Sequence, residues 1–248
     1  MSRNRRAPFL PLRTLLRQRF PDRGDPEELI ARGIVTADGA PMTNPDARVR
    51  ADASIRLHWE NPLRGTVKLG HALHAFSLDV SDLVALDVGA AAGGFTQALL
   101  DAGARRVYAV DVGFGQLRGV LRQDRRVVNL ERTNIALLDH RLMGEEVDLV
   151  TMDLSYLPVA DALPQIPRRF LASDARLLVL VKPTYELRTG TLAARPEDVA
   201  SALDSVRSVL ALHRWRSLGS VRSPIRGARG AAEAFVLARR EPDQATST

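Results

Sequence analysis

Two rare side chains in this sequence can act as bases. Among its 35 cationic residues only Lys68 and Lys182 are lysines. Arginine keeps its charge at any useful pH, whereas a desolvated lysine can lose its proton and then accept one from a hydroxyl group. Asp153 and Glu233 are candidate partners, because each stands where an apolar run ends or begins. Two ammonium groups and two carboxylates could together carry out proton transfer and orient a reacting hydroxyl.

The apolar runs that would position these residues predict an α/β fold. Runs at 83–88, 107–112, 147–152 and 177–181 alternate with helical segments, as in a parallel sheet covered on both faces. A further strand is expected to end at Thr133-Asn134. Two last strands, 215–221 and 232–238, follow a long helix at 196–213 and are joined by a loop, so they must be antiparallel. We therefore expect a seven-stranded, mostly parallel sheet with an antiparallel last strand.

This topology predicts that the four charged residues meet at one edge of the sheet. Asp153 closes the fourth strand and Lys182 closes the fifth, so both lie at the carboxyl edge. Lys68 is expected to begin the helix that leads into the first strand, and Glu233 to begin the antiparallel last strand. Taken singly, each residue could be a surface charge, a helix cap or an ion-pair partner. Their convergence favours a catalytic site.

A glycine-rich turn follows the first strand and predicts a cofactor site. The segment 87–95 reads Asp-Val-Gly-Ala-Ala-Ala-Gly-Gly-Phe and leads into a helix. Glycines at such a turn let the backbone approach a ligand closely at the carboxyl edge of the sheet. The spacing differs from the dinucleotide motif and from the phosphate loop, so a diphosphate cofactor is disfavoured. The alternative is ordinary packing of a helix on a strand.

Asp111 supports the cofactor interpretation. It ends the second strand, about twenty residues further on, where an acidic residue can accept both hydroxyls of a ribose. A ribose without a diphosphate indicates S-adenosylmethionine, with Asp87 and the turn near its amino-acid part and Thr133-Asn134 near its adenine. The candidate cofactor-binding residues are Asp87, Gly89, Ala90, Gly93, Gly94, Phe95, Asp111, Val112, Thr133 and Asn134.

Composition narrows the classes of protein to which the chain can belong. Hydrophobic residues make up 45% and charged residues 26%, as in a globular protein. The absence of cysteine excludes disulfides, thiolate metal sites and a cysteine nucleophile, and no metal site is predicted. A net charge of +6 suits a polyanionic partner such as RNA, although the arginines are spread along the chain. Pro8 and Pro11 interrupt the N-terminal apolar stretch, so no signal peptide is predicted and a cytoplasmic location is expected.

The chain is expected to contain two parts. Residues 1–57 form a small unit with helical patterns at 12–20 and 26–32 and short extended pieces, and 58–67 form a linker. The larger domain covers 68–240, and 241–248 are a frayed tail. Trp59 and Trp215 could stack on bases, although packing in a linker or core is the favoured role.

Several motifs together resemble the TlyA family of ribosomal RNA 2′-O-methyltransferases, relatives of the FtsJ/RrmJ heat-shock methyltransferases. The resemblance covers about residues 68–240. It implies a Rossmann-like class I methyltransferase fold, S-adenosylmethionine as methyl donor and a Lys-Asp-Lys-Glu tetrad matching the four residues above. More loosely, the N-terminal unit resembles the family's small α+β RNA-binding module. The motifs are the turn at 87–95, Asp-Val-Gly-Phe-Gly-Gln-Leu at 111–117, Glu-Arg-Thr-Asn at 131–134, Met-Asp-Leu-Ser at 152–155 and Val-Lys-Pro at 181–183.

The resulting hypothesis is methylation of an RNA ribose. Lys182, desolvated and beside cationic Lys68, would remove the hydroxyl proton, while Asp153 and Glu233 would favour the charged lysine and orient it. The N-terminal unit and the scattered arginines would hold RNA by its phosphates. Three alternatives remain: a methyltransferase for a small hydroxylated metabolite, a catalytically silent RNA-binding or assembly protein, and a haemolysin, for which no membrane-spanning segment is visible.

Overall fold

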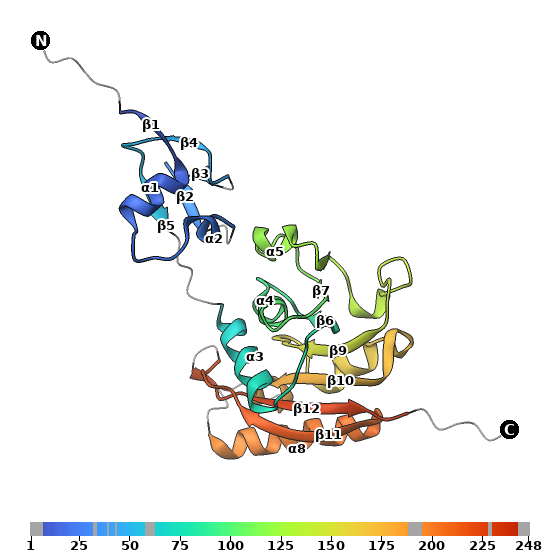
Figure 1. Cartoon of the computed structure of the whole chain (residues 1–248). Coiled ribbons are helices and arrows are strands. Elements are labelled where there is room, and N and C mark those ends of the chain that lie inside the picture. Colours follow the sequence, from blue (N-terminus) through green and yellow to red (C-terminus); the bar gives the residue numbers. More distant parts are fainter. Residues whose placement is uncertain are drawn as a thin grey trace, which may run out of the picture. The chain divides into compact units, whose positions relative to one another are not determined.

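The computed structural model describes residues 7–31, 34–38, 40–42, 44–57, 63–187, 195–227 and 230–242. The chain divides into two compact units, Met1–Asn61 and Pro62–Thr248, which Figure 1 shows with their elements labelled. Each unit has a hydrophobic core of its own.

The N-terminal unit is built around leucines on one helix. Helix α1 (Leu12–Arg19) buries Leu12, Leu15 and Leu16 on one face, which is the spacing of an amphipathic helix. These side chains pack with residues from α2 (Pro26–Ala31) and the short strands. The strands are β1 (Phe9–Pro11), β2 (Val35–Ala37), β3 (Ala40–Pro41), β4 (Arg48–Arg50) and β5 (Ile55–Leu57), in the sheets β1-β4 and β3-β2-β5. Both predicted helices are present; the pairing of β1 with β4 was not predicted.

The larger unit contains the predicted seven-stranded sheet. Its strand order is β11-β12-β10-β9-β6-β7-β8, and β12 pairs antiparallel with both of its neighbours. The other pairs are parallel. The strands are β6 (Val84–Val88), β7 (Arg106–Asp111), β8 (Val127–Glu131), β9 (Val147–Met152), β10 (Leu171–Val181), β11 (Trp215–Arg222) and β12 (Ala234–Arg240). All five residues of β6 are buried, as expected for a central strand covered on both faces.

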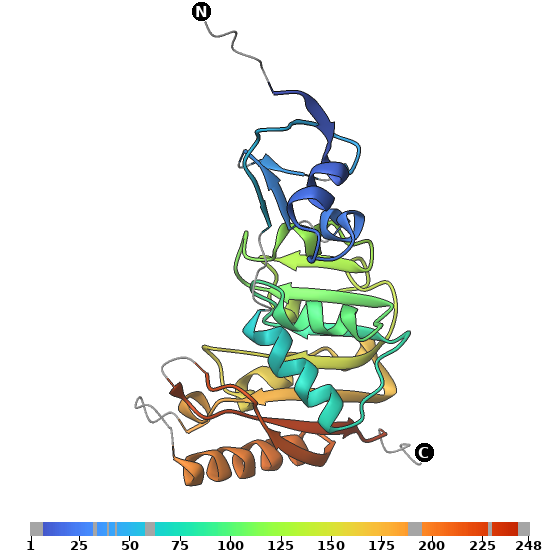
Figure 2. The same ribbon diagram turned by 60° about the vertical axis from the view of Figure 1, so that its left-hand side comes forward.

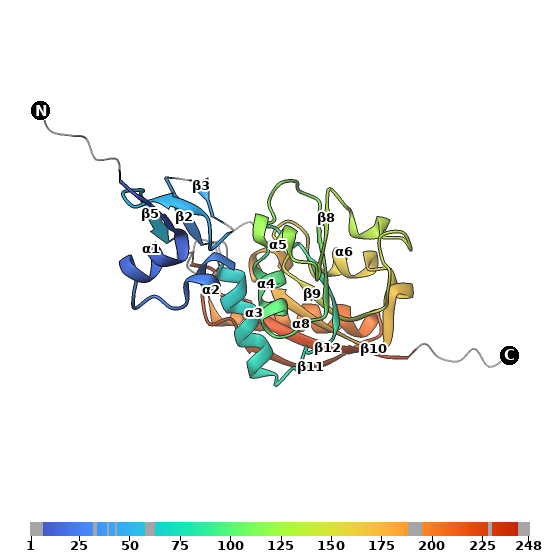
Figure 3. The same ribbon diagram turned by 45° about the horizontal axis from the view of Figure 1, so that its top comes forward.

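Helices cover the two faces of this sheet with separate cores. On one face lie α3 (Arg64–Ala75), α4 (Gly94–Asp101) and α5 (Gly119–Gln123), whose apolar residues pack against alternate strand positions; Figure 2 shows α3 in teal lying across the strands. On the other face, α6 (Val159–Ala162) and α8 (Pro196–Leu212) join the larger core (Figure 3). Helix α7 (Pro183–Glu186) follows β10 directly.

The start of α3 differs from the prediction. The linker was expected to extend to residue 67 and the helix to begin at Lys68, but α3 begins at Arg64 and Lys68 lies in its second turn. The physical reason is the packing of Gly65, whose added Cβ would lie 3.1 Å from the Cα of Gly94. This glycine, interpreted as a turn residue, instead lets two helices touch. Residues 58–62 of the predicted linker, with Trp59, lie outside the described residues.

Smaller differences concern the ends of strands. Strand β8 ends at Glu131, so Thr133 and Asn134 follow it, and β12 begins at Ala234, one residue after Glu233. Trp215 is 3% exposed and belongs to the core, which confirms the packing alternative. Of the predicted tail, residues 243–248 lie outside the described part. None of the helices in the described residues has the length and apolar character needed to cross a membrane.

Candidate active site

The glycine-rich turn after β6 is a crowded junction of three elements. Gly89 has φ 83°, and a Cβ there would lie 2.6 Å from the carbonyl oxygen of Asp153. Gly93 has φ 92° and faces the side chains of Leu117 and Leu121. Because both residues combine a left-handed backbone with no room for a side chain, only glycine fits without strain. The turn therefore brings bare backbone to the carboxyl edge, as a cofactor-binding turn requires.

Asp111 joins this turn to the end of β7. Its Oδ2 accepts the backbone N–H of Ala91 at 2.9 Å, and its Oδ1 accepts that of Gly113 at 2.7 Å. An ionised carboxylate has about four acceptor positions, so two stay available for the hydroxyls of a ribose. The site therefore fits a nucleoside: the partly exposed carboxylate of Asp111 lies next to a turn, residues 89–94, made only of glycine and alanine.

Asp87, predicted near the cofactor's amino-acid part, is fully buried. Its carboxylate accepts the hydroxyls of Thr96 at 2.7 Å and Thr151 at 3.0 Å. Burial raises the pKa of Asp87 to about 6, against the opposing effect of the two hydroxyl donors. Asp87 therefore ties β6 to α4 and β9 and positions the turn, and its side chain does not reach open space.

The other predicted cofactor residues divide by exposure. Phe95 is 3% exposed and packs against Phe235 with ring centroids 5.9 Å apart, so its ring belongs to the core. Val112 is 52% exposed beyond the end of β7. Thr133 donates its backbone N–H to the carbonyl of Asp111 at 3.0 Å. Asn134 caps the short helix that begins at Ile135 by accepting the N–H of Ala136. Val112 and Thr133 thus lie beside Asp111, at the predicted cofactor site.

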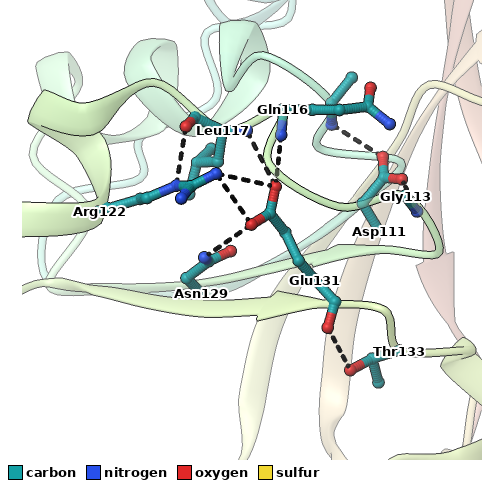
Figure 4. A network of polar contacts seen from close by, with 9 residues as sticks. Asp111, Gly113, Gln116, Leu117, Arg122, Asn129, Glu131 and Thr133 are labelled. Carbon is teal, nitrogen blue, oxygen red and sulfur yellow. Dashed lines mark hydrogen bonds and ion pairs between the residues drawn. The ribbon is translucent and has the colours of Figure 1, made fainter.

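Glu131 is a positioning residue that the sequence did not single out. Figure 4 shows its carboxylate at the centre of a polar network beside Asp111. It accepts the backbone N–H groups of Gln116 at 2.7 Å and Leu117 at 3.1 Å, and Arg122 lies 3.0 Å away. These hydrogen bonds, led by that of Leu117, lower the pKa of Glu131 to about 2. The glycine-containing loop after Asp111 is thereby fixed from the neighbouring strand.

Two of the four predicted catalytic residues, Lys68 and Glu233, form a buried ion pair. The Nζ of Lys68 lies 2.5 Å from Oε2 of Glu233, with side-chain exposures of only 8% and 4%. Gly227, in the loop between β11 and β12, lies so close to the Glu233 carboxylate that a Cβ on this glycine would collide with it. This part of the loop therefore covers the pair. Arg64, one turn before Lys68, donates to the carbonyl of Arg226 in the same loop. Neither residue is the solvated surface charge that was the alternative.

The second pair is more accessible. The Nζ of Lys182 lies 2.5 Å from Oδ1 of Asp153 and donates to Oγ of Ser155 at 2.7 Å. The exposed fractions of the two charged side chains are 12% and 25%. Ser155, which the sequence motif contained but did not mark as functional, holds the lysine from the same strand end as Asp153. An i, i+2 spacing at the end of a strand is the signal that could have identified it.

Strand register brings the two pairs to one rim. Val181 pairs with Ala234 across β10 and β12, so the next residues in register are Lys182 and Glu233. Val88 pairs with Met152 across β6 and β9, so Asp153 stands beside the glycine-rich turn, where its backbone N–H donates to the carbonyl of Val88 at 3.1 Å. The sequence also predicted carboxylates that favour the charged lysines, and in the structure the Nζ of each lysine has a carboxylate oxygen 2.5 Å away.

The chain is similar to several known proteins. Residues 63–240 match the family model described as FtsJ-like methyltransferase. The 16S/23S rRNA (cytidine-2′-O)-methyltransferase TlyA of Mycobacterium tuberculosis is 40% identical over 89% of this chain and 85% of its own length. Hemolysin A of Brachyspira hyodysenteriae is 28% identical over 85% of this chain and 91% of its own length.

Solved structures agree with the fold. A haemolysin-named protein from Streptococcus thermophilus has a TM-score of 0.68 at 27% identity, covering 97% of this chain and 93% of its own. A SAM-dependent methyltransferase from Aquifex aeolicus has a TM-score of 0.51 at 18% identity, covering 72% and 93%. The predicted Rossmann-like class I methyltransferase fold is therefore confirmed. The matched family model spans nearly all of the larger unit, and a TlyA protein is 40% identical over most of the chain. The chain therefore belongs to the FtsJ-like methyltransferase family and, within it, to the TlyA group that the motifs predicted.

Proposed function

We propose that the chain transfers a methyl group from S-adenosylmethionine to the 2′-hydroxyl of a ribose in RNA, with ribosomal RNA as the substrate. The observation that carries this proposal is the rim where two Lys–carboxylate pairs stand beside the glycine-rich turn. The 40% identity to an rRNA 2′-O-methyltransferase supports it. A ribosomal substrate also agrees with the cytoplasmic location expected from the sequence.

The cofactor would be held by the turn and by Asp111. The free acceptor positions of Asp111 suit the two ribose hydroxyls, and Val112 and Thr133 stand where the adenine would pack. The N-terminus of α4, directly after Gly93, favours a negative group such as the amino-acid carboxylate. When bound, S-adenosylmethionine supplies an electrophilic methyl group on a sulfonium.

Lys182 is the residue proposed to handle the hydroxyl proton. As the neutral amine that a base requires, Lys182 would keep two N–H donors and one lone pair; Ser155 accepts one N–H and Asp153 lies 2.5 Å from the nitrogen. The lone pair would then accept the proton of the substrate hydroxyl. Asp153 would hold Lys182 in place, and the buried Lys68–Glu233 pair would position the rim. General acid–base help of this kind contributes about 10²- to 10⁴-fold to the rate.

The test compares the protein with its Lys182→Arg and Lys182→Met variants. Each is incubated with S-adenosylmethionine labelled in the methyl group and with ribosomal subunits or deproteinised ribosomal RNA. Alkaline hydrolysis then locates the label, because 2′-O-methylation blocks cleavage at that nucleotide. We expect labelled ribose with the unchanged protein and a loss of about 10²-fold or more with Lys182→Arg, because a guanidinium does not give up its proton.

Each remaining outcome contradicts part of the proposal. Substantial activity of Lys182→Arg would remove Lys182 as the base while leaving the reaction intact. Label on a base, or on small hydroxylated metabolites in place of RNA, would assign a different substrate. If calorimetry finds RNA binding but no binding of S-adenosylmethionine, the chain is a catalytically silent RNA-binding protein.

A further inference from the structure

Three arginines form a straight row across neighbouring strands of the large sheet. Arg176 of β10 pairs in register with Arg239 of β12, and Arg239 pairs with Arg216 of β11. Residues directly opposite each other in an antiparallel pair point to the same face, about 5 Å apart. We call Arg176, Arg239 and Arg216 the arginine row. Like charges directly opposite each other destabilise a sheet, so a bound anion would stabilise this arrangement.

The charges of the row are poorly balanced from within the protein. Arg216 and Arg239 are exposed, and neither forms an ion pair or a side-chain hydrogen bond with any residue in the described part of the chain. Arg176 differs, because its charge interacts with Asp79. Hydrogen bonds from Ser81 are the main cause of the lowered pKa of Asp79, and the charge of Arg176 lowers it further. Two adjacent guanidinium groups are therefore free to bind a ligand.

A cavity of about 590 Å³ adjoins the row. Its lining includes Arg216 and Arg239 from the row, together with Arg214 and Arg240. Arg240 is held in place by donating to the carbonyls of Leu171 at 2.6 Å and of Ala172 at 3.1 Å. The carboxylates in the lining belong to Asp174 and Glu241. The lining thus holds four arginines and two acidic residues; Arg214 and Arg240 donate to backbone carbonyls, so Arg216 and Arg239 are the arginines of this lining that can bind an anion.

This basic surface lies far from the proposed methyl-transfer rim. Arg239 is six residues along β12 from Glu233 and close to the opposite end of the strand, a separation of about 20 Å at the rise of a β-strand. The arginines therefore cannot take part in the methyl-transfer chemistry. Arginine suits phosphate groups because its planar fork donates two parallel hydrogen bonds.

We propose that the arginine row and its cavity bind the phosphate backbone of the RNA substrate, at the amino edge of the sheet. This proposal rests on the proposed function, because it assigns a second contact to the same RNA. Spaced guanidinium groups on neighbouring strands fit successive phosphates of one strand, and phosphate contacts position a nucleic acid without reading its sequence. The surface would hold RNA while the ribose reacts at the other edge.

The test removes two positive charges from the arginine row and compares the effect with that of removing two positive charges elsewhere on the protein. The variant is Arg216→Gln with Arg239→Gln. The control is Arg105→Gln with Arg207→Gln, which removes the same charge from arginines already paired with Glu145 and Asp204. Binding of labelled polyuridylate and of deproteinised ribosomal RNA is measured by fluorescence anisotropy over a range of salt concentrations. Binding of S-adenosylmethionine and the melting temperature are measured alongside.

We expect the row variant to bind both RNAs several-fold more weakly, with a salt-dependence slope smaller by about 1.4 for two lost contacts with single-stranded RNA. The KM for ribosomal RNA should rise with kcat and cofactor binding unchanged. The melting temperature should not fall, because the substitution removes like-charge repulsion. The control variant should keep the slope of the unchanged protein.

Other results overturn the proposal in distinguishable ways. An unchanged slope in the row variant, with methyl transfer to RNA intact, rejects the row and leaves the proposed function standing. An equal loss in the control shows a general effect of net charge and also rejects the row. If the unchanged protein neither binds nor methylates RNA, the proposed function fails and this contact fails with it.

Discussion

The two halves of the sheet's carboxyl edge stabilise their carboxylates in different ways. At the carboxyl ends of β9 and β10 and at the start of β12, each carboxylate has an oxygen 2.5 Å from the Nζ of a lysine. At the ends of β6, β7 and β8, the carboxylates are held mainly by neutral donors: hydroxyls for Asp87 and backbone N–H groups for Asp111 and Glu131. The first half therefore carries balanced charge suited to moving a proton. In the second half Asp87 is buried and Glu131 is paired with Arg122, so Asp111 is the carboxylate of the three that can accept hydroxyls of the proposed cofactor.

Within the balanced half, burial separates the two ion pairs. The Lys68–Glu233 pair is almost fully enclosed, whereas Asp153 keeps 25% of its side chain exposed. A buried charge whose partner is removed cannot be solvated by water, but a partly exposed one can. We therefore propose that the enclosed pair maintains the rim and that the more accessible pair meets the substrate.

Removing one partner from each pair should give the largest difference between the two pairs. Lys68→Met leaves Glu233 charged and buried, so we expect the free energy of unfolding to fall by about 3–5 kcal/mol. Lys182→Met leaves Asp153 with 25% of its side chain exposed but with a buried Oδ1 that accepts no hydrogen bond from the described residues, so the loss should be smaller, about 1–3 kcal/mol. Denaturant unfolding of the two variants measures both values.

A double substitution provides the control. Lys68→Met combined with Glu233→Gln removes the uncompensated charge, so most of the stability should return while methyl transfer stays impaired. Equal destabilisation by the two single substitutions, or no recovery in the double variant, would mean that burial does not distinguish the pairs.

Asp87, in the half held by neutral donors, should make the stability of the protein depend on pH. Its folded-state pKa of about 6 lies above the ordinary value of 3.8, so the folded protein binds this proton more tightly than the unfolded chain. Stability from this group is therefore complete below about pH 4 and is lost as the pH rises through about 6, by about 3 kcal/mol in total. In Asp87→Asn that loss should be absent.

The measurement is the free energy of unfolding of both proteins between about pH 4 and pH 7. The difference between them isolates Asp87, because every other titrating group is common to both. The asparagine can keep its hydrogen bonds, since the hydroxyls of Thr96 and Thr151 can also accept. Two pH profiles that run parallel would show that Asp87 is ionised throughout and that its burial is offset by the hydroxyls.

The sequence predicted the framework of this site more fully than its contacts. Apolar runs alternating with helices gave the strand identities, and the ends of those strands placed Lys182 and Asp153 at one edge. Which lysine meets which carboxylate depends on register and side-chain direction, which spacing along the chain does not reveal. The start of α3 was missed for a similar reason: Gly65 is helical because it touches Gly94, a contact between distant segments.

Glu131 escaped prediction for a related physical reason. Its main partners are backbone N–H groups 14 and 15 residues earlier in the chain, and every non-proline residue has such a group. No residue type therefore marks the donors. The motif Glu-Arg-Thr-Asn identified the segment by resemblance, but only the folded loop shows that the glutamate holds the residues after Asp111 in place.

Glu131→Gln gives the smallest expected effect and tests the second half of the edge. The amide presents one oxygen where the carboxylate presents two, so Gln116, Leu117, Asn129 and Arg122 cannot all keep their acceptor. We expect the loop to loosen and the KM for S-adenosylmethionine to rise several-fold with little change in kcat, because Glu131 does not touch the reacting atoms. Steady-state kinetics measures that split.

Two further results would sharpen the role of Glu131. Glu197→Gln, at an exposed position on α8, is the matched control and should change neither constant. The contribution of Glu131 to the free energy of unfolding should depend on pH with the opposite sign to that of Asp87. Because the pKa of Glu131 is lowered to about 2, this contribution is complete above about pH 4.5 and is lost as the pH falls towards 2. A fall in kcat with KM unchanged would contradict the positioning role and would place Glu131 at the reacting group.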